Sequence, residues 1–182
     1  DLMQHKQTLF SALQLTIQPQ DFLKRLTQKK LNTVAIGLIM DDNGVLPVIR
    51  AMGEIAGGTS ISIAAELLSN VNNGVGSILG GISGISPTEV VIIGAGMVGV
   101  CAARAAMGLG ATVKVFDNST YRLSRLQDQL GHRIYTSVIV PKVLEKHLRT
   151  ADVAIGAMRA IGGRTPCIVT EKMVSDMKNG SV

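Results

Sequence analysis

The sequence contains no tryptophan, and aromatic residues make up only 3% of its 182 residues. Its apolar fraction of 46% therefore comes mainly from Val, Ile, Leu, Ala and Met, a composition typical of buried parallel strands and close-packed helices. The two cysteines, Cys101 and Cys167, are too few for a disulfide framework. We interpret them as reduced thiols and expect a cytoplasmic protein. A chain of this length allows one domain, or one domain and part of another.

The distribution of charge disfavours two classes of partner. The net charge is +5, but the densest basic group, residues 24–30, has the spacing of a solvated helix face and no aromatic residue for base stacking. We therefore expect no nucleic-acid partner. The most apolar window, residues 90–113, holds one charge, Arg104, and is interrupted by Gly-Ala-Gly. This window predicts a buried strand, a turn and a helix, and we expect no membrane span.

The first part of the chain predicts a strand, a helix and a second strand. The strands are expected at residues 8–15 and 33–40, and Pro19 is expected near the start of the helix between them. A long helix then begins at Pro47 and runs to about residue 70. Its interior glycines predict either close approach of another backbone or ligand, or a helix that is kinked or broken in two. These glycines are Gly53, Gly57 and Gly58.

A glycine-rich loop follows at residues 72–87. A flexible linker would be more polar, so we expect this loop to pack onto the protein. The residues that indicate packing are Ile78, Leu79, Ile82 and Ile85.

From Glu89 onward, strands and helices alternate with short connections. This order predicts an α/β fold with a doubly wound parallel sheet, preceded by the short strand–helix–strand remnant. The chain begins at Asp1 and stops at Val182, where another strand is due, so we expect both ends to be cut. Strands are expected at residues 90–93, 112–116, 134–138 and 152–157, and helices at 97–109, 119–130, 141–150 and 171–177.

The stretch VVIIGAGMVG contains the spacing G-x-G-x-x-G, and its surroundings fit a dinucleotide site. It follows an apolar strand, opens a helix, and precedes an acidic residue, Asp117, at the end of the next strand. Gly94 permits a tight turn, Gly96 lets the backbone approach a pyrophosphate, and Gly99 lets helix and strand pack closely. The pyrophosphate is expected on the free N–H groups at the start of the helix. The predicted contacts are Gly94, Ala95, Gly96, Met97, Val98 and Gly99.

The acidic residue predicts which cofactor binds. Asp117 is expected to accept hydrogen bonds from the adenosine ribose hydroxyls, and its charge would repel a 2′-phosphate. The predicted cofactor is therefore NAD(H), held in a Rossmann-type domain. Arg122, one helical turn further on, either weakens this exclusion or is an exposed helix charge.

Five longer stretches, which together cover most of the chain, carry a resemblance to a known family. They are "DNGVLPVIRAMGEIAG", "SILGGISGISPTEVVIIGAGMVG", "AARAAMGLGATVKVFDNSTYRLSRLQDQLG", "ADVAIGA" and "VTEKMVSDMKNGSV". Together they resemble the alanine dehydrogenase and pyridine nucleotide transhydrogenase family. The resemblance implies that residues 1–47 are the C-terminal part of the first substrate-domain segment and residues 48–182 the NAD-binding domain, truncated at its C-terminal end. It also implies a homo-oligomer that converts L-alanine to pyruvate and ammonia with NAD⁺.

The same resemblance implies further site residues and one departure. Ala157, Met158 and Arg159 would lie near the nicotinamide. At the position of the family's catalytic His this chain has Gln14, and Gln cannot act as a general acid or base near neutral pH. We therefore expect no catalytic residue in this chain, and no metal site.

Two other family positions also differ, which leaves three functions open. Ile36-Gly37 replaces a Tyr-Glu pair, and Gly53 replaces a Ser. The leading hypothesis is the NAD(H)-binding part of an alanine dehydrogenase. The alternatives are the nucleotide-binding subunit of a proton-translocating transhydrogenase and a non-catalytic NAD(H)-binding or sensing protein. The remaining histidines are expected on the surface, namely His5, His132 and His147.

Overall fold

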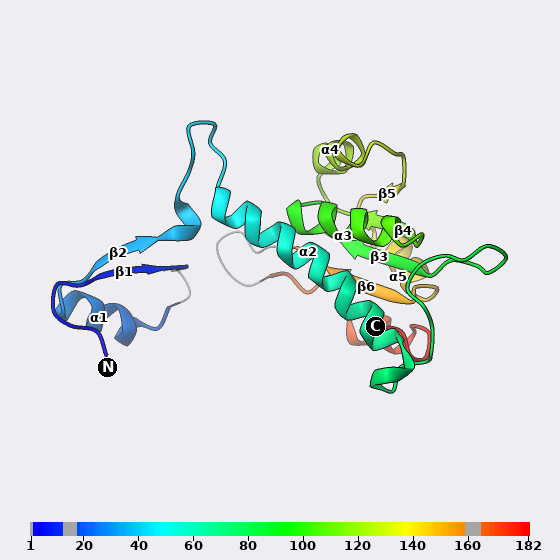
Figure 1. Cartoon of the computed structure of the whole chain (residues 1–182), viewed down its shortest axis with the longest axis horizontal. Helices are drawn as coiled ribbons and strands as arrows, with labels where there is room; N and C mark the ends of the chain where they lie inside the picture. The colour runs from blue at the N-terminus through cyan, green and yellow to red at the C-terminus, as the bar shows by residue number, and fades with distance from the viewer. Residues whose placement is uncertain (1, 13–17, 159–164) are drawn as a thin grey trace. The chain divides into compact units, whose positions relative to one another are not determined.

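The computed structural model describes residues 2–12, 18–158 and 165–182 (Figure 1). The described residues up to Met52 form one compact unit, and those from Gly53 onward form a second. No helix within these described ranges has the length and apolar character needed to cross a membrane.

The first unit consists of two parallel strands joined by a helix, as predicted. Strand β1 (Thr8–Ser11) pairs with β2 (Asn32–Ala35), and α1 (Gln20–Gln28) connects them. Pro19 precedes α1, where its lack of an N–H costs no helical hydrogen bond. Leu26 is the buried residue of this helix.

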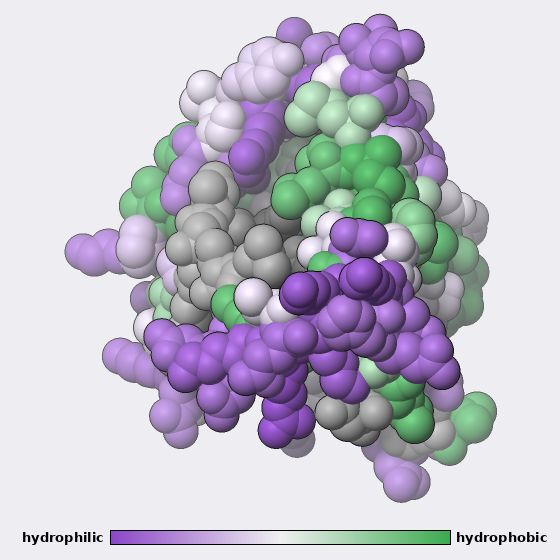
Figure 2. All heavy atoms as spheres, turned by 90° about the vertical axis from the view of Figure 1, so that its left-hand side faces the viewer, coloured by the Kyte–Doolittle hydropathy of each residue, from purple (hydrophilic) through white to green (hydrophobic). Residues whose placement is uncertain are grey.

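The surface seen in Figure 2 is largely hydrophilic, with separate hydrophobic areas. In the first unit, Lys24 and Arg25 are exposed, as expected for a solvated helix face. Three large apolar side chains of the same unit are exposed as well, namely Phe10, Leu38 and Met40.

The second strand of this unit is shorter than predicted. The sequence predicts a strand that reaches Met40, but β2 stops at Ala35 and a 3₁₀ turn, η2 (Ile36–Leu38), follows. Gly37 lies in this turn, and glycine is disfavoured in strands because it costs backbone entropy and has no side chain to pack. A Cβ at Gly37 would lie 3.3 Å from Cδ1 of Ile49, so a side chain has little room there.

The second unit is a four-stranded parallel sheet with helices on both faces, which confirms the predicted doubly wound α/β fold (Figure 1). The strand order is β5-β4-β3-β6, so the chain adds strands on one side of β3 and then crosses to the other. The strands are β3 (Glu89–Ile93), β4 (Thr112–Phe116), β5 (Tyr135–Ser137) and β6 (Val153–Gly156). The helices are α3 (Met97–Gly108), α4 (Thr120–Leu130), α5 (Pro141–Leu148) and α6 (Glu171–Ser175).

Alternate residues of β3 enter two separate cores. Val90 and Ile92 pack with residues of α3 and α4, whereas Val91 and Ile93 pack on the opposite face with residues of α5 and α6. All four are at most 4% exposed. A strand buried on both faces must be apolar at every position, which is why Val90–Ile93 forms an unbroken apolar run.

The long helix α2 (Pro47–Leu68) is unbroken, and its glycines allow close helix packing. A Cβ at Gly57 would lie 2.5 Å from the Val98 carbonyl oxygen, and one at Gly53 would lie 3.2 Å from the Met97 side chain. Close approach of another backbone is therefore correct at Gly57, whereas at Gly53 the close neighbour is a side chain. Gly58 has open space instead.

The glycine-rich loop packs onto the protein through its backbone and not through its isoleucines. Leu79 is buried as expected, but the expectation was wrong for Ile78, Ile82 and Ile85, which are all more than half exposed. Hydrogen bonds attach the loop instead. Gly80 N–H donates to Thr88 Oγ1 at 2.8 Å, and Gly81 N–H donates to the Leu109 carbonyl at 3.1 Å.

One histidine differs from the surface expectation. His147 is half-buried in an aromatic cluster, with its Nε2 3.0 Å from the Tyr135 hydroxyl and its ring centroid 5.7 Å from that of Phe116. Burial and the nearby Lys114 and Lys146 lower the pKa of His147. His5 and His132 are exposed, as expected.

Candidate functional site

The chain turns sharply from β3 into α3 at Gly94, as predicted. Gly94 has a φ of 121°, a conformation that side-chain-bearing residues rarely adopt. Its N–H donates to the Phe116 carbonyl at 2.7 Å, and a Cβ built on it would lie 2.5 Å from the Ala157 carbonyl oxygen. The turn is thus held between the ends of β4 and β6, where only glycine fits.

Gly99 brings the first turn of α3 directly against this loop. A Cβ at Gly99 would overlap the carbonyl oxygen of Gly94, so the two backbones are in van der Waals contact. This is the close packing expected of the third glycine of the motif.

Gly96, in contrast, adjoins open space. It is the N-cap of α3, no side chain caps the helix there, and a Cβ would have no neighbour within 4 Å. The first N–H groups of a helix have no acceptor within the helix, and they lie at the positive end of its dipole. Gly96, Met97 and Val98 are half-buried. An anionic group such as a pyrophosphate fits this opening in shape and in charge.

Asp117 lies at the end of β4, directly beside the turn. It is 3% exposed, and its Oδ2 accepts a hydrogen bond from Ala95 N–H at 2.8 Å. Its Oδ1 accepts one from Ser119 N–H, also at 2.8 Å. Arg122 Nη1 is 3.8 Å from Oδ2, and the Arg122 side chain is half exposed. Both oxygens of the carboxylate therefore already accept hydrogen bonds from the protein itself.

The residues after β6 border the other side of the turn. Ala157 N–H donates to the Ile93 carbonyl at 2.8 Å, which places Ala157 beside Gly94. Met158 lines a small, largely apolar cavity of about 280 Å³ together with Ile93 and Gly156. Its remaining lining residues are Thr165, Pro166, Cys167, Ile168 and Val169. Arg159 and Gln14 lie outside the described residues.

The structure thus gathers the predicted residues at the carboxyl ends of three adjacent strands. The motif follows β3, Asp117 follows β4, and Ala157 follows β6. The strand order changes direction between β3 and β6. In open α/β sheets, ligands bind at such a switch point, outside the carboxyl ends of the strands.

Three features of this site were not predicted from the sequence. The bond from Ser119 to Asp117 follows from local spacing, because Asp commonly accepts the N–H two residues ahead. The bond from Ala95 to Asp117 joins residues 22 apart and depends on the sheet bringing them together. The apolar cavity beside Met158 likewise has no sequence signal, because its lining comes from three separate segments.

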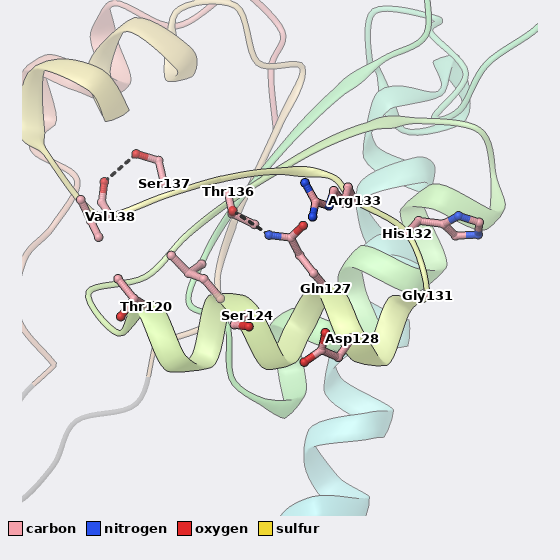
Figure 3. A pocket seen from close by; sticks show the side chains of 11 residues that line it. Thr120, Ser124, Gln127, Asp128, Gly131, His132, Arg133, Thr136, Ser137 and Val138 are labelled. Carbon is pink, nitrogen blue, oxygen red and sulfur yellow. Dashed lines mark hydrogen bonds between the residues drawn. The ribbon is translucent and has the colours of Figure 1, made fainter.

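A larger hollow of about 680 Å³ lies elsewhere, between α4 and the edge strand β5 (Figure 3). Within it Gln127 Nε2 donates to Thr136 Oγ1 at 3.1 Å. None of the predicted site residues lines this hollow. We therefore locate the candidate site at the glycine turn, where backbone donors and a carboxylate converge.

Gly37 and Gly53 stand at two other positions where this chain departs from the family pattern. Gly37 lies in the η2 turn, and Gly53 packs on Met97. Among the residues that the structure describes, no group of three or more His, Cys, Asp or Glu side chains is arranged to hold a metal ion.

The second unit matches a known family. The model of the alanine dehydrogenase/PNT C-terminal domain matches residues 60–182. The alanine dehydrogenase of Bilophila wadsworthia is 36% identical over 181 residues, covering 100% of this chain and 48% of the relative. The alanine dehydrogenase of Methanococcus maripaludis is 37% identical over 182 residues, with the same coverage. The chain spans about half the length of these relatives.

Solved structures agree with these sequence matches. An L-alanine dehydrogenase superposes with a TM-score of 0.87 at 36% identity, covering 99% of this chain and 50% of that structure. A transhydrogenase from Sinorhizobium meliloti superposes with a TM-score of 0.76 at 20% identity, covering 96% of this chain and 50% of that structure. At this identity the match shows a similar fold alone. The chain therefore belongs to the alanine dehydrogenase/PNT family, and its second unit is a Rossmann-type domain.

Proposed function

We propose that this chain is the NAD(H)-binding part of an alanine dehydrogenase, which in its intact form catalyses the reversible oxidative deamination of L-alanine to pyruvate and ammonia. The observation that carries the proposal is the uncapped start of α3 beside the open space at Gly96. Identities of 36% and 37% to alanine dehydrogenases favour this reaction over that of a transhydrogenase, where the identity is 20%.

In this proposal the chain binds and orients the cofactor. When bound there, NAD⁺ would supply the hydride acceptor of the reaction. Residues 48–182 form the NAD domain, and residues 1–47 belong to the substrate domain. The residues assigned to the pyrophosphate are Gly94, Ala95, Gly96, Met97, Val98 and Gly99, with Asp117 and Arg122 near the adenosine ribose and Ala157, Met158 and Arg159 near the nicotinamide.

Turnover of L-alanine tests the reaction. We expect the intact protein to reduce NAD⁺ when L-alanine is added, which the rise in NADH absorbance measures, and to show no rise without an amino acid. Binding of NADH without turnover would instead favour the sensing alternative. Hydride transfer from NADH to NADP⁺ in the absence of alanine turnover would favour the transhydrogenase alternative.

We also propose that the intact protein is a homo-oligomer, and that it is cytoplasmic because this chain contains only two cysteines. Helix α2 supports the first point. One side carries buried residues such as Ile61 and Leu68, yet Ile55, Ile63 and Leu67 are 63%, 50% and 42% exposed. A helix that is apolar on opposite sides is normally buried on both. A second copy of the chain is our proposed cover.

The oligomer proposal predicts the effect of a charge on α2. We expect Ile63→Asp to lower the mass of the intact protein in analytical ultracentrifugation, because a carboxylate in an apolar contact is costly to desolvate. Val174→Asp is the matched control, since Val174 is 56% exposed on α6. The proposal fails if both variants keep the wild-type mass.

A further inference from the structure

Asp117 is a buried carboxylate that joins two separate backbone segments. Its side chain is 4% exposed, and each of its oxygens accepts one backbone N–H at 2.8 Å. One donor, Ala95, belongs to the glycine turn, and the other, Ser119, is the N-cap of α4. Little of the carboxylate surface is therefore left to face a ligand.

These bonds define the shape of the turn before any ligand arrives. Gly94 N–H is held by the Phe116 carbonyl at 2.7 Å, and Ala95 N–H by Asp117. Two successive N–H groups of the turn are thus tied to the end of β4. The next residue, Gly96, adjoins open space and is the N-cap of α3. The end of β4 therefore holds the turn in place, and with it the free N–H groups at the start of α3 that an anion would contact.

We propose that Asp117 is a positioning residue that holds the glycine turn in the form that receives the dinucleotide pyrophosphate. This inference rests on the proposed NAD(H) function and extends it, because Asp117 then affects binding through Ala95, independently of the ribose hydroxyls. Such preorganisation strengthens binding, because the ligand does not have to order the turn itself.

The variant Asp117→Asn separates the two roles. Asn has one acceptor oxygen and an NH₂ group that only donates, so it can satisfy one of the two backbone donors but not both. Asp128→Asn is the matched control, because Asp128 is exposed on α4 and its replacement removes the same charge without touching the turn.

The experiment measures dissociation constants of the intact protein for NADH and for an NADH analogue that lacks the 2′- and 3′-hydroxyls of the adenosine ribose. We expect Asp117→Asn to weaken both ligands by a similar factor, about tenfold or more. Asp128→Asn should leave both constants unchanged. Weakening of NADH alone would overturn the proposal in favour of a ribose contact, and so would unchanged binding of both ligands.

Amide hydrogen exchange without ligand gives a second readout. We expect Asp117→Asn to accelerate exchange at Ala95 while Val91 and Ile92, in the core strand, stay protected. Equal acceleration at all three would indicate general destabilisation and would overturn the proposal, as would unchanged exchange at Ala95. Wild-type protein that does not bind NADH would refute the proposed function, whereas exchange at Ala95 would still decide whether Asp117 holds the turn.

Discussion

Gly99→Ala is expected to destabilise the protein by about 3 kcal/mol and to weaken NADH binding at least tenfold. The added Cβ would overlap the Gly94 carbonyl oxygen, which is backbone and cannot rotate away. Relief requires α3 to move off the turn, but Val100, Ala102 and Ala103 fix this helix in the core at no more than 3% exposure. The clash therefore strains both the core and the cofactor site. Urea unfolding and NADH titration measure the two effects.

Gly108→Ala is the matched control for this substitution. Gly108 ends the same helix, and a Cβ there would have no neighbour within 4 Å. We expect the free energy of unfolding of this variant to differ from that of the wild type by less than about 1 kcal/mol, because the only change is the higher helix propensity of Ala compared with Gly. If Gly99→Ala unfolds at the same urea concentration as this control, the close contact between Gly94 and Gly99 is absent in solution.

Sequence reasoning located this contact because the motif constrains neighbouring residues. The run Val90–Ile93, the spacing of the glycines and the position of Asp117 all concern short segments whose pattern follows directly from strand and helix geometry. The structure confirms the resulting fold, with β3 buried on both faces and α3 starting at Met97. The assignment of these residues to NAD(H) contacts stays a prediction.

Features that depend on distant parts of the chain were harder to predict. The need for glycine at position 57 becomes clear only in the structure, where α3 packs against α2. A Cβ built on Gly57 would lie 2.5 Å from the Val98 carbonyl oxygen. The loop isoleucines look like core residues in sequence, yet hydrogen bonds of Gly80 and Gly81 attach the loop and leave Ile82 and Ile85 exposed. Hydrophobicity alone does not distinguish these two modes of attachment.

Gly96→Ala is expected to weaken NADH binding about 100-fold while changing stability by less than about 1 kcal/mol. The residue has φ −78° and ψ −170°, an extended conformation open to alanine, and a Cβ there would have no neighbour within 4 Å. The fold therefore accepts the methyl group. The pyrophosphate does not, because the methyl group would occupy the space through which it approaches the backbone. Losing about two charge-assisted hydrogen bonds accounts for the size of the effect.

Gly58→Ala provides the control, since Gly58 also has open space around it but lies on α2. We expect its NADH affinity to equal that of the wild type. Wild-type affinity in Gly96→Ala would show that the dinucleotide does not approach the turn, and unfolding of this variant would show that the space is not open. Gly96→Ala and Gly99→Ala thus weaken binding for opposite reasons: the first blocks the ligand in an intact fold, and the second distorts the fold that presents the site. Measuring stability and affinity on both variants therefore separates the residue that faces the ligand from the residue that shapes the turn.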